Sequence, residues 1–152
     1  MRVLFVCLGN ICRSPMAEEI LRHQIAQAGL SDAITVDSAG TGDWHTGETA
    51  DPRTIQILAS HGIPCGSISR QLRSEDFDNF DILYGMDRNN LSDMNAWRGA
   101  KPEKVRPFMS EDVPDPYYGG REGYENMFYM LETGCAAILK ELSTALNSRS
   151  DL

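Results

Sequence analysis

The chain has 152 residues and a formal net charge of −8, with 41% hydrophobic and 24% charged residues. This length and composition are typical of one globular domain with a sizeable core, so we expect a single domain over residues 1–152. The negative charge argues against nucleic acid or an anionic membrane as a partner, and no stretch is apolar enough to span a bilayer.

The first predicted element is a buried parallel strand at residues 3–6, where four apolar residues run together. A helical pattern begins at Pro15, with Ser14 in the N-cap position. The loop between them must turn tightly, and Gly9 and Asn10 both tolerate left-handed backbone. Such a loop directs its N–H groups toward one point, where the helix N-terminus adds partial positive charge. The sequence therefore predicts an anion-binding loop.

This loop carries Cys7 at one rim and Arg13 at the other. A thiol is a strong nucleophile only when it ionises, and loop amides, a helix N-terminus and a guanidinium all favour the thiolate. Arg13 can hold two phosphate oxygens at once. The spacing of Cys7 and Arg13, in a loop that follows a strand and opens a helix, therefore predicts in-line attack of Cys7 on a bound phosphoryl group. The alternative is an unreactive, buried Cys7 and a surface Arg13. The residues expected to bind the phosphate are Leu8, Gly9, Asn10, Ile11, Cys12, Arg13 and Ser14.

Strands and helices alternate along the rest of the chain. The predicted elements are, in order, a helix at 15–28, a strand at 34–38, a loop at 39–50, a helix at 51–61, a helical turn at 74–77, a strand at 81–85, a helix from 87 to about 97, a strand at 105–108, a loop at 109–123, a long helix from 124, and a frayed tail at 147–152. Residues 69–72 are ambiguous. The alternation predicts an α/β fold, a four-stranded parallel sheet with helices on both faces in the flavodoxin-like or Rossmann-like order 2-1-3-4.

In such a sheet, ligands bind beyond the carboxyl ends of the strands. Cys7 lies at the end of the first strand, and the long loops 39–50 and 109–123 follow the second and fourth strands. We therefore expect both loops to wall the site that contains Cys7.

The second of these loops contains the segment Asp115-Pro116-Tyr117-Tyr118. A carboxylic acid on a stiff loop can protonate a departing phenolate, and two tyrosines can cover an aromatic leaving group. Asp115 is therefore a candidate general acid. On its own, the segment is more typical of an ordinary turn with surface tyrosines, and only the loop that contains Cys7 favours the general acid.

The four cysteines are Cys7, Cys12, Cys65 and Cys135, and their spacing matches no metal-binding pattern. The N-terminus lacks the features of a signal peptide, so we expect reduced thiols and a cytoplasmic location. We expect no metal and no cofactor, because loop amides and Arg13 supply the positive charge that phosphate needs.

The chain resembles the low-molecular-weight protein tyrosine phosphatases over nearly its whole length. The matching segments are VCLGNICRSPMAE at the start, DSAGT at 37–41, DW at 43–44, DPR at 51–53, HGI at 61–63, MDRNNL at 86–91 and DPYYGG at 115–120. The resemblance implies a protein tyrosine phosphatase that hydrolyses phosphotyrosine through a cysteinyl-phosphate. Its substrates would be phosphotyrosine-containing proteins, supplied by a cognate tyrosine kinase, and it would be a monomer or a weak dimer.

The resemblance also implies roles for particular residues. Cys7 would be the nucleophile, Arg13 the phosphate binder and Asp115 the general acid. Asn10, Ser14 and Ser38 would hold the loop and the thiolate by hydrogen bonds, and Cys12 would pair with Cys7 on oxidation. The substrate cleft would be walled by Leu8, Ile11, Trp44, Tyr117 and Tyr118. His45, Thr46 and Glu48 lie in a loop that varies within the family, so their roles stay open.

Three alternatives are weaker. A related arsenate reductase needs further cysteines near the third strand, and residues 81–95 contain none. A protein arginine phosphatase has a threonine where this chain has Ile11. A cysteine phosphocarrier has no use for Arg13 or for an acid on a distant loop. Against the arginine phosphatase, Ile11 favours phosphotyrosine, because its apolar side chain suits a phenol ring better than a guanidinium.

Overall fold

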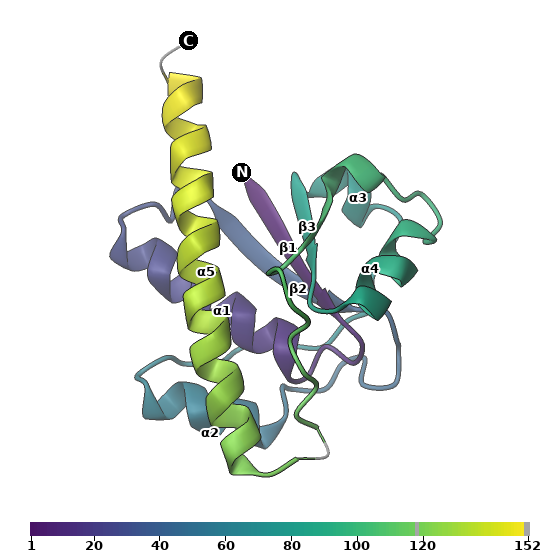
Figure 1. Cartoon of the computed structure of the whole chain (residues 1–152), viewed down its shortest axis with the longest axis vertical. Helices are drawn as coiled ribbons and strands as arrows, with labels where there is room; N and C mark the ends of the chain where they lie inside the picture. Colours follow the sequence, from purple (N-terminus) through teal and green to yellow (C-terminus); the bar gives the residue numbers. More distant parts are fainter. Residues whose placement is uncertain (118, 151–152) are drawn as a thin grey trace.

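The computed structural model describes residues 1–117 and 119–150, the last two of these by their backbone alone. Its centre is a sheet of parallel strands, ordered β2-β1-β3-β4 as predicted (Figure 1). The strands are β1 (Arg2–Cys7), β2 (Thr35–Gly40), β3 (Ile82–Gly85) and β4 (Val105–Pro107). The sheet therefore carries Cys7 at the carboxyl end of a central strand, at the edge where α/β proteins bind ligands.

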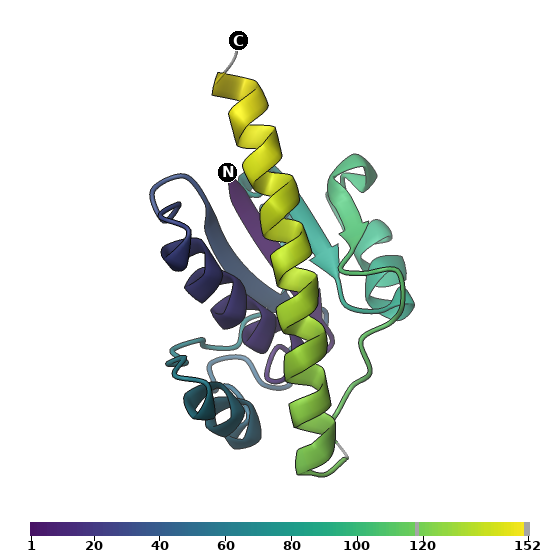
Figure 2. The same ribbon diagram turned by 60° about the vertical axis from the view of Figure 1, so that its left-hand side comes forward.

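Helices cover both faces of this sheet, as Figures 1 and 2 show. The helical elements are α1 (Arg13–Gln27), α2 (Pro52–Ser60), α3 (Asp76–Asn79), α4 (Arg88–Asn95), the 3-10 turn η1 (Pro102–Lys104) and α5 (Arg121–Ser150). α1 and α5 lie on one face with α2 packed beside them, and α3 and α4 lie on the other.

Strand β1 shows why the sheet has two covered faces. Val3 and Phe5 belong to the core shared with α1 and α5, whereas Leu4 and Val6 belong to the core shared with α3 and α4. None of the four side chains is exposed. Because successive strand residues point to opposite faces, a continuous apolar run is the pattern of a strand buried on both sides. This packing holds Cys7 rigidly.

Several helix boundaries differ from the sequence prediction: the helical turn predicted at 74–77 is α3 at Asp76–Asn79, and the helix predicted to reach about residue 97 ends at Asn95. Two further differences concern α1 and α5. α1 begins at Arg13, so Pro15 lies within the first turn, where its missing N–H costs no helical hydrogen bond. α5 begins at Arg121 and continues to Ser150, so the tail expected to fray from Asn147 is helical over its described part. No glycine or proline interrupts the chain there. Among the described residues, no helix combines the length and the apolar character that a membrane crossing requires.

Residues 69–72, ambiguous in sequence, lie against the end of β2. Gly40 donates its N–H to the carbonyl of Arg70 at 2.9 Å, and Leu72 donates its N–H to the carbonyl of Gly40 at 2.7 Å. This segment therefore extends the sheet edge beside the loop that follows Cys7.

Candidate active site

The loop that follows β1 curls back on the sulfur of Cys7. Asn10 has a φ of +56°, the left-handed conformation predicted for it, whereas Gly9 does not adopt that conformation. The Asn10 N–H donates to the Cys7 Sγ at 3.3 Å. Gly9 serves a different purpose, because a Cβ there would lie 3.2 Å from the His45 ring. The missing side chain therefore lets the 39–50 loop approach closely.

Ser14 does not cap α1, contrary to the sequence prediction. The N-cap position is held by Cys12, which makes no capping hydrogen bond. The Ser14 hydroxyl lies instead 2.9 Å from the Cys7 Sγ and accepts a hydrogen bond from Asn10 Nδ2 at 2.8 Å. The turn places this hydroxyl inside the loop, where it contacts the candidate nucleophile.

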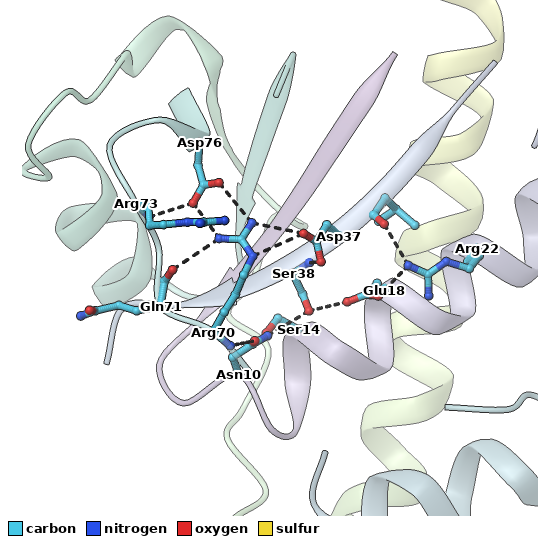
Figure 3. Close-up of polar contacts among 11 residues, drawn as sticks. Asn10, Ser14, Glu18, Arg22, Asp37, Ser38, Arg70, Gln71, Arg73 and Asp76 are labelled. Carbon is cyan, nitrogen blue, oxygen red and sulfur yellow. Dashed lines mark hydrogen bonds and ion pairs between the residues drawn. The ribbon is translucent and has the colours of Figure 1, made fainter. Parts of the chain in front are cut away.

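The side chain of Asn10 joins the loop to two neighbouring segments (Figure 3). Its Nδ2 also donates to Ser38 Oγ on β2 at 2.9 Å, and its Oδ1 accepts the Arg70 N–H at 3.0 Å. Both ends of the amide are therefore satisfied. A residue in the left-handed region costs free energy unless its surroundings hold it, and these contacts do so.

Arg13 is a buried residue, with 3% of its surface exposed, and not the surface arginine of the alternative interpretation. Its Nη1 donates to Asp87 Oδ2 at 2.5 Å and to the carbonyl of Val113 at 3.0 Å, while its Nη2 lies 3.7 Å from Asp115 Oδ2. Burial alone would lower the pKa of this guanidinium, but the charges of Cys7, Asp87 and Asp115 outweigh burial and raise it. Arg13 is thus a fixed cation beside Cys7.

Asp87 is a residue of the site that the sequence reasoning missed. The sequence predicts that a helix begins at Asp87, and in the structure Asp87 is the N-cap of α4, where its Oδ1 accepts the Asn90 N–H at 2.7 Å. Its second oxygen binds Arg13. The available signal was its position two residues after β3, at the edge of the sheet that contains Cys7.

The loop that carries Asp115 is fastened to the start of α2. Arg53 donates to the carbonyls of Tyr117 and Gly119 at 2.9 and 3.1 Å, and its guanidinium also pairs with Asp51. Asp115 Oδ1 accepts the Tyr117 N–H at 3.0 Å, and the carboxylate remains 45% exposed. The Asp115 carboxylate is therefore held in place yet open to solvent and to a ligand.

A cavity of about 320 Å³ lies over the loop, within the size range of small-molecule sites. Its lining residues are Cys7, Leu8, Gly9, Asn10, Ile11, Cys12, Arg13, Trp44, His45, Asp115 and Tyr117. The structure therefore places both predicted wall loops at one cavity. Tyr118 lies outside the described residues. His45, whose role the sequence left open, lines the cavity and is held by Glu48 through a 2.6 Å contact, whereas Thr46 does not line it.

Cys12 lines the cavity, but its side chain is buried beside Tyr124 of α5. Its Sγ lies 3.2 Å from the Tyr124 hydroxyl. Burial raises the pKa of the Cys12 thiol to about 12, against a smaller lowering by the Tyr124 hydrogen bond. Cys12 is therefore a protonated thiol at neutral pH.

Taken together, these groups can bind a tetrahedral oxyanion and present one sulfur to it. Cys7, the loop residues, Arg13 and Asp115 line the same cavity, so an oxyanion bound there could contact the loop N–H groups and the Arg13 guanidinium. Among the side chains that the structure describes, no group of three histidine, cysteine or acidic residues could hold a metal ion.

Comparisons with known proteins agree with this geometry. Residues 2–148 match the family of low molecular weight phosphotyrosine protein phosphatases. The chain is 42% identical over 154 residues to such a phosphatase from Schizosaccharomyces pombe, covering 93% of this chain and 97% of the relative. It is similar to the crystal structure of a protein tyrosine phosphatase from Entamoeba histolytica, with a TM-score of 0.90, 36% identity, and 95% and 98% of the two chains covered.

A further solved structure is that of YwlE arginine phosphatase, in a variant whose active-site serine is phosphorylated. It superposes with a TM-score of 0.88 at 28% identity, covering 94% of this chain and 96% of that one. The family match and the tyrosine phosphatase relatives together establish that the chain belongs to the low molecular weight phosphotyrosine protein phosphatase family.

Proposed function

We propose that this protein hydrolyses phosphotyrosine in proteins, through a cysteinyl-phosphate formed on Cys7. The observation that carries the proposal is the meeting of Cys7, Arg13 and Asp115 at one cavity in a chain of this family. Cys7 receives the Asn10 N–H and lies against the Ser14 hydroxyl, two contacts that suit a thiolate.

In the first step, the Cys7 thiolate attacks phosphorus in line with the tyrosine oxygen. The S–P bond forms as the P–O bond breaks, and Asp115 gives its proton to the departing phenolate oxygen. Arg13 and the loop N–H groups stabilise the three equatorial oxygens, whose charge shifts as the bond breaks. The fixed, buried Arg13 needs little reorganisation to do this.

In the second step, water hydrolyses the cysteinyl-phosphate. Asp115, now ionised, accepts a proton from the water as its oxygen attacks phosphorus, and the Cys7 thiolate leaves. Free phosphate is released, and Asp115 is protonated again for the next cycle. The phosphorylated active-site serine reported for the YwlE variant supports this kind of intermediate in the fold.

The cavity walls favour an aromatic substrate. Ile11 and Leu8 present aliphatic surface, and Trp44 and Tyr117 present rings around the phosphate-binding loop. Burying a phenol ring there would contribute roughly 1–3 kcal/mol. Phosphoarginine is the second candidate substrate, because an arginine phosphatase shares the fold. Its guanidinium N–H groups would meet Ile11 without an acceptor, which costs about 1–3 kcal/mol. The physiological substrates would then be phosphotyrosine proteins of the cytoplasm, made by a tyrosine kinase.

The proposal is tested by comparing wild type with Cys7→Ser on p-nitrophenyl phosphate. Wild type should release inorganic phosphate, and acid-quenched samples should contain phosphate bound to Cys7. Cys7→Ser should lose turnover and still bind inorganic phosphate, because Arg13 and the loop N–H groups remain. Turnover by Cys7→Ser would remove Cys7 from the nucleophile's role, and phosphate bound to Cys7 without release would indicate a phosphocarrier.

A further inference from the structure

Glu18 is a buried carboxylate that the proposed reaction does not use. It lies on α1 with 5% of its surface exposed. Its Oε1 accepts the Ser38 hydroxyl proton at 2.5 Å, and its Oε2 accepts Arg22 Nη2 at 2.6 Å. Such a short charge-assisted contact is typical of an ionised carboxylate. Figure 3 shows Glu18 between Arg22 and the Ser38–Asn10–Ser14 cluster.

An ionised carboxylate can only accept hydrogen bonds, and this fixes the proton of Ser38. A hydroxyl has one proton, so Ser38 gives that proton to Glu18 and can only accept at its other contact. That contact is Asn10 Nδ2, at 2.9 Å, which donates. The direction of each hydrogen bond follows from the one before it.

Asn10 passes the same direction on to Ser14. Its amide is held from the other side, because Oδ1 accepts the Arg70 N–H at 3.0 Å and a flipped amide would place an NH₂ group against that donor. Nδ2 therefore also donates to Ser14 Oγ, at 2.8 Å. Ser14 accepts there, and its single proton is left for Cys7 Sγ, 2.9 Å away.

We propose that Glu18 is a positioning residue for Cys7. Its carboxylate, held by Arg22, orients the hydrogen bonds through Ser38 and Asn10 so that Ser14 donates to the Cys7 thiolate. This rests on the proposed function of Cys7 as the nucleophile. Glu18 itself touches neither the substrate position nor the sulfur.

The charged and titratable neighbours of this chain of hydrogen bonds lie at its two ends and beside its middle in the described structure. Around Glu18 they are Arg22, on the same helix, and Cys65, whose pKa is raised mainly by burial and also by Glu18. Beside Ser38 and Asn10 they are Asp37, whose Oδ1 accepts the Ser38 N–H at 2.8 Å, and Arg70, whose guanidinium pairs with Asp37. Around Cys7 they are Arg13 and Cys12. None of these charged side chains contacts both Glu18 and Cys7. A substitution at Glu18 is therefore expected to affect Cys7 through the hydroxyl and amide groups of Ser38, Asn10 and Ser14.

The test uses the rate at which iodoacetamide alkylates Cys7 in the full-length protein, measured from pH 4 to 8. This neutral reagent reads the thiolate directly, so the result does not depend on phosphatase activity. Glu18→Gln keeps the shape of the side chain, but its amide can donate as well as accept, so the Ser38 hydroxyl is no longer forced to donate to residue 18. The alkylation profile should move to higher pH, with a rate about tenfold lower on its acidic limb. kcat/KM for p-nitrophenyl phosphate should fall on the same limb, while inhibition by inorganic phosphate changes little.

Glu19→Gln is the matched control. Glu19 is the next residue on α1, is equally buried, and also pairs with Arg22, but its other contact is the Gly66 N–H at 2.8 Å and not Ser38. This variant should keep the wild-type alkylation profile. In a Ser38→Ala background, adding Glu18→Gln should cause no further shift, because the connection is already cut.

Three results would overturn the proposal: a wild-type profile for Glu18→Gln, an equal shift for Glu19→Gln, or an undiminished effect in the Ser38→Ala background. If Glu18→Gln does not fold, Arg22→Met gives a second measurement at a half-exposed side chain. It leaves Glu18 without its cation and should shift the profile in the same direction, and an unchanged profile would contradict the proposal. If the profiles shift as expected but wild type releases no phosphate, the positioning role stands and the proposed function fails.

Discussion

Asp87 and Arg13 are joined so that one carboxylate serves both a helix cap and the phosphate-binding loop. Asp87 Oδ2 accepts from Arg13 Nη1 at 2.5 Å, while Oδ1 accepts the Asn90 N–H at the start of α4. The Arg13 guanidinium, which follows β1, is thereby fixed to the start of α4, which follows β3. The two roles of Asp87 can be separated by substitution.

Asp87→Asn should keep the cap and lose the ion pair, because asparagine is as good an N-cap as aspartate. We expect kcat/KM for p-nitrophenyl phosphate to fall about tenfold, since Arg13 loses the ion pair with Asp87 that orients its guanidinium. Asp87→Ala should lose the same activity and about 1 kcal/mol more of the free energy of unfolding, from the missing cap. Urea unfolding and steady-state kinetics of both variants check this. Full activity in Asp87→Asn would show that the ion pair does not orient Arg13.

Asp115→Asn should slow hydrolysis most for substrates whose leaving oxygen is a strong base. A stable leaving anion such as p-nitrophenolate needs little protonation, so its loss should be smaller. The comparison is kcat for alkyl-substituted phenyl phosphates against p-nitrophenyl phosphate. An equal loss on both would mean that Asp115 only positions its loop. Arg53→Met, which frees that loop from α2, should by contrast lower the rate on both substrates alike.

The sequence predicts the fold well because its signals are local. Apolar runs, the Asp51-Pro52 start of α2 and the glycine after α1 give the alternation and hence the strand order. It also predicts Cys7 and Arg13, whose spacing is confined to one loop. It does not predict the partners of Arg13 and of the Asp115 loop, because Asp87 and Arg53 contact them from 74 and 64 residues away. The N-cap prediction for Ser14 is wrong for a related reason, since capping preference is weaker than the hydroxyl's contacts inside the folded loop. The contact of Ser14 with Cys7 is expected from the family resemblance and not from local pattern.

Oxidation should link Cys7 to Cys12 in a strongly pH-dependent way. Peroxide converts the Cys7 thiolate to a sulfenic acid, and the Cys12 sulfur then displaces water to form the disulfide. Because burial raises the pKa of Cys12 to about 12, its thiolate fraction grows about tenfold per pH unit below that value. Disulfide closure should therefore be faster at pH 8 than at pH 6.

This prediction is checked by mass spectrometry of peroxide-treated protein, digested without reductant. Tyr124→Phe should slow closure further, because the Tyr124 hydrogen bond lowers the pKa of Cys12. Accumulation of Cys7 as sulfinic or sulfonic acid at both pH values, with Cys12 free, would show that Cys12 does not protect Cys7.

Ile11→Thr should weaken the preference for phosphotyrosine over phosphoarginine. The substitution removes apolar surface from the cavity wall and adds a hydroxyl that can accept from a guanidinium. We expect kcat/KM to fall about tenfold for phosphotyrosine and to rise for phosphoarginine. Ile11→Val, which keeps an apolar wall, is the matched control and should retain the wild-type preference. A fall on both substrates alike would indicate damage to the loop.

The action of the site on phosphotyrosine is tested most directly by comparing kcat/KM of the wild-type protein for three peptides. The peptides share one sequence and carry phosphotyrosine, phosphoarginine or phosphoserine at the same position. kcat/KM should be higher for phosphotyrosine by roughly one to three orders of magnitude. Only its side chain has an aromatic ring to pack against the cavity wall formed by Ile11, Trp44 and Tyr117. A preference for phosphoarginine would contradict phosphotyrosine hydrolysis as the function and assign the protein to the arginine phosphatases.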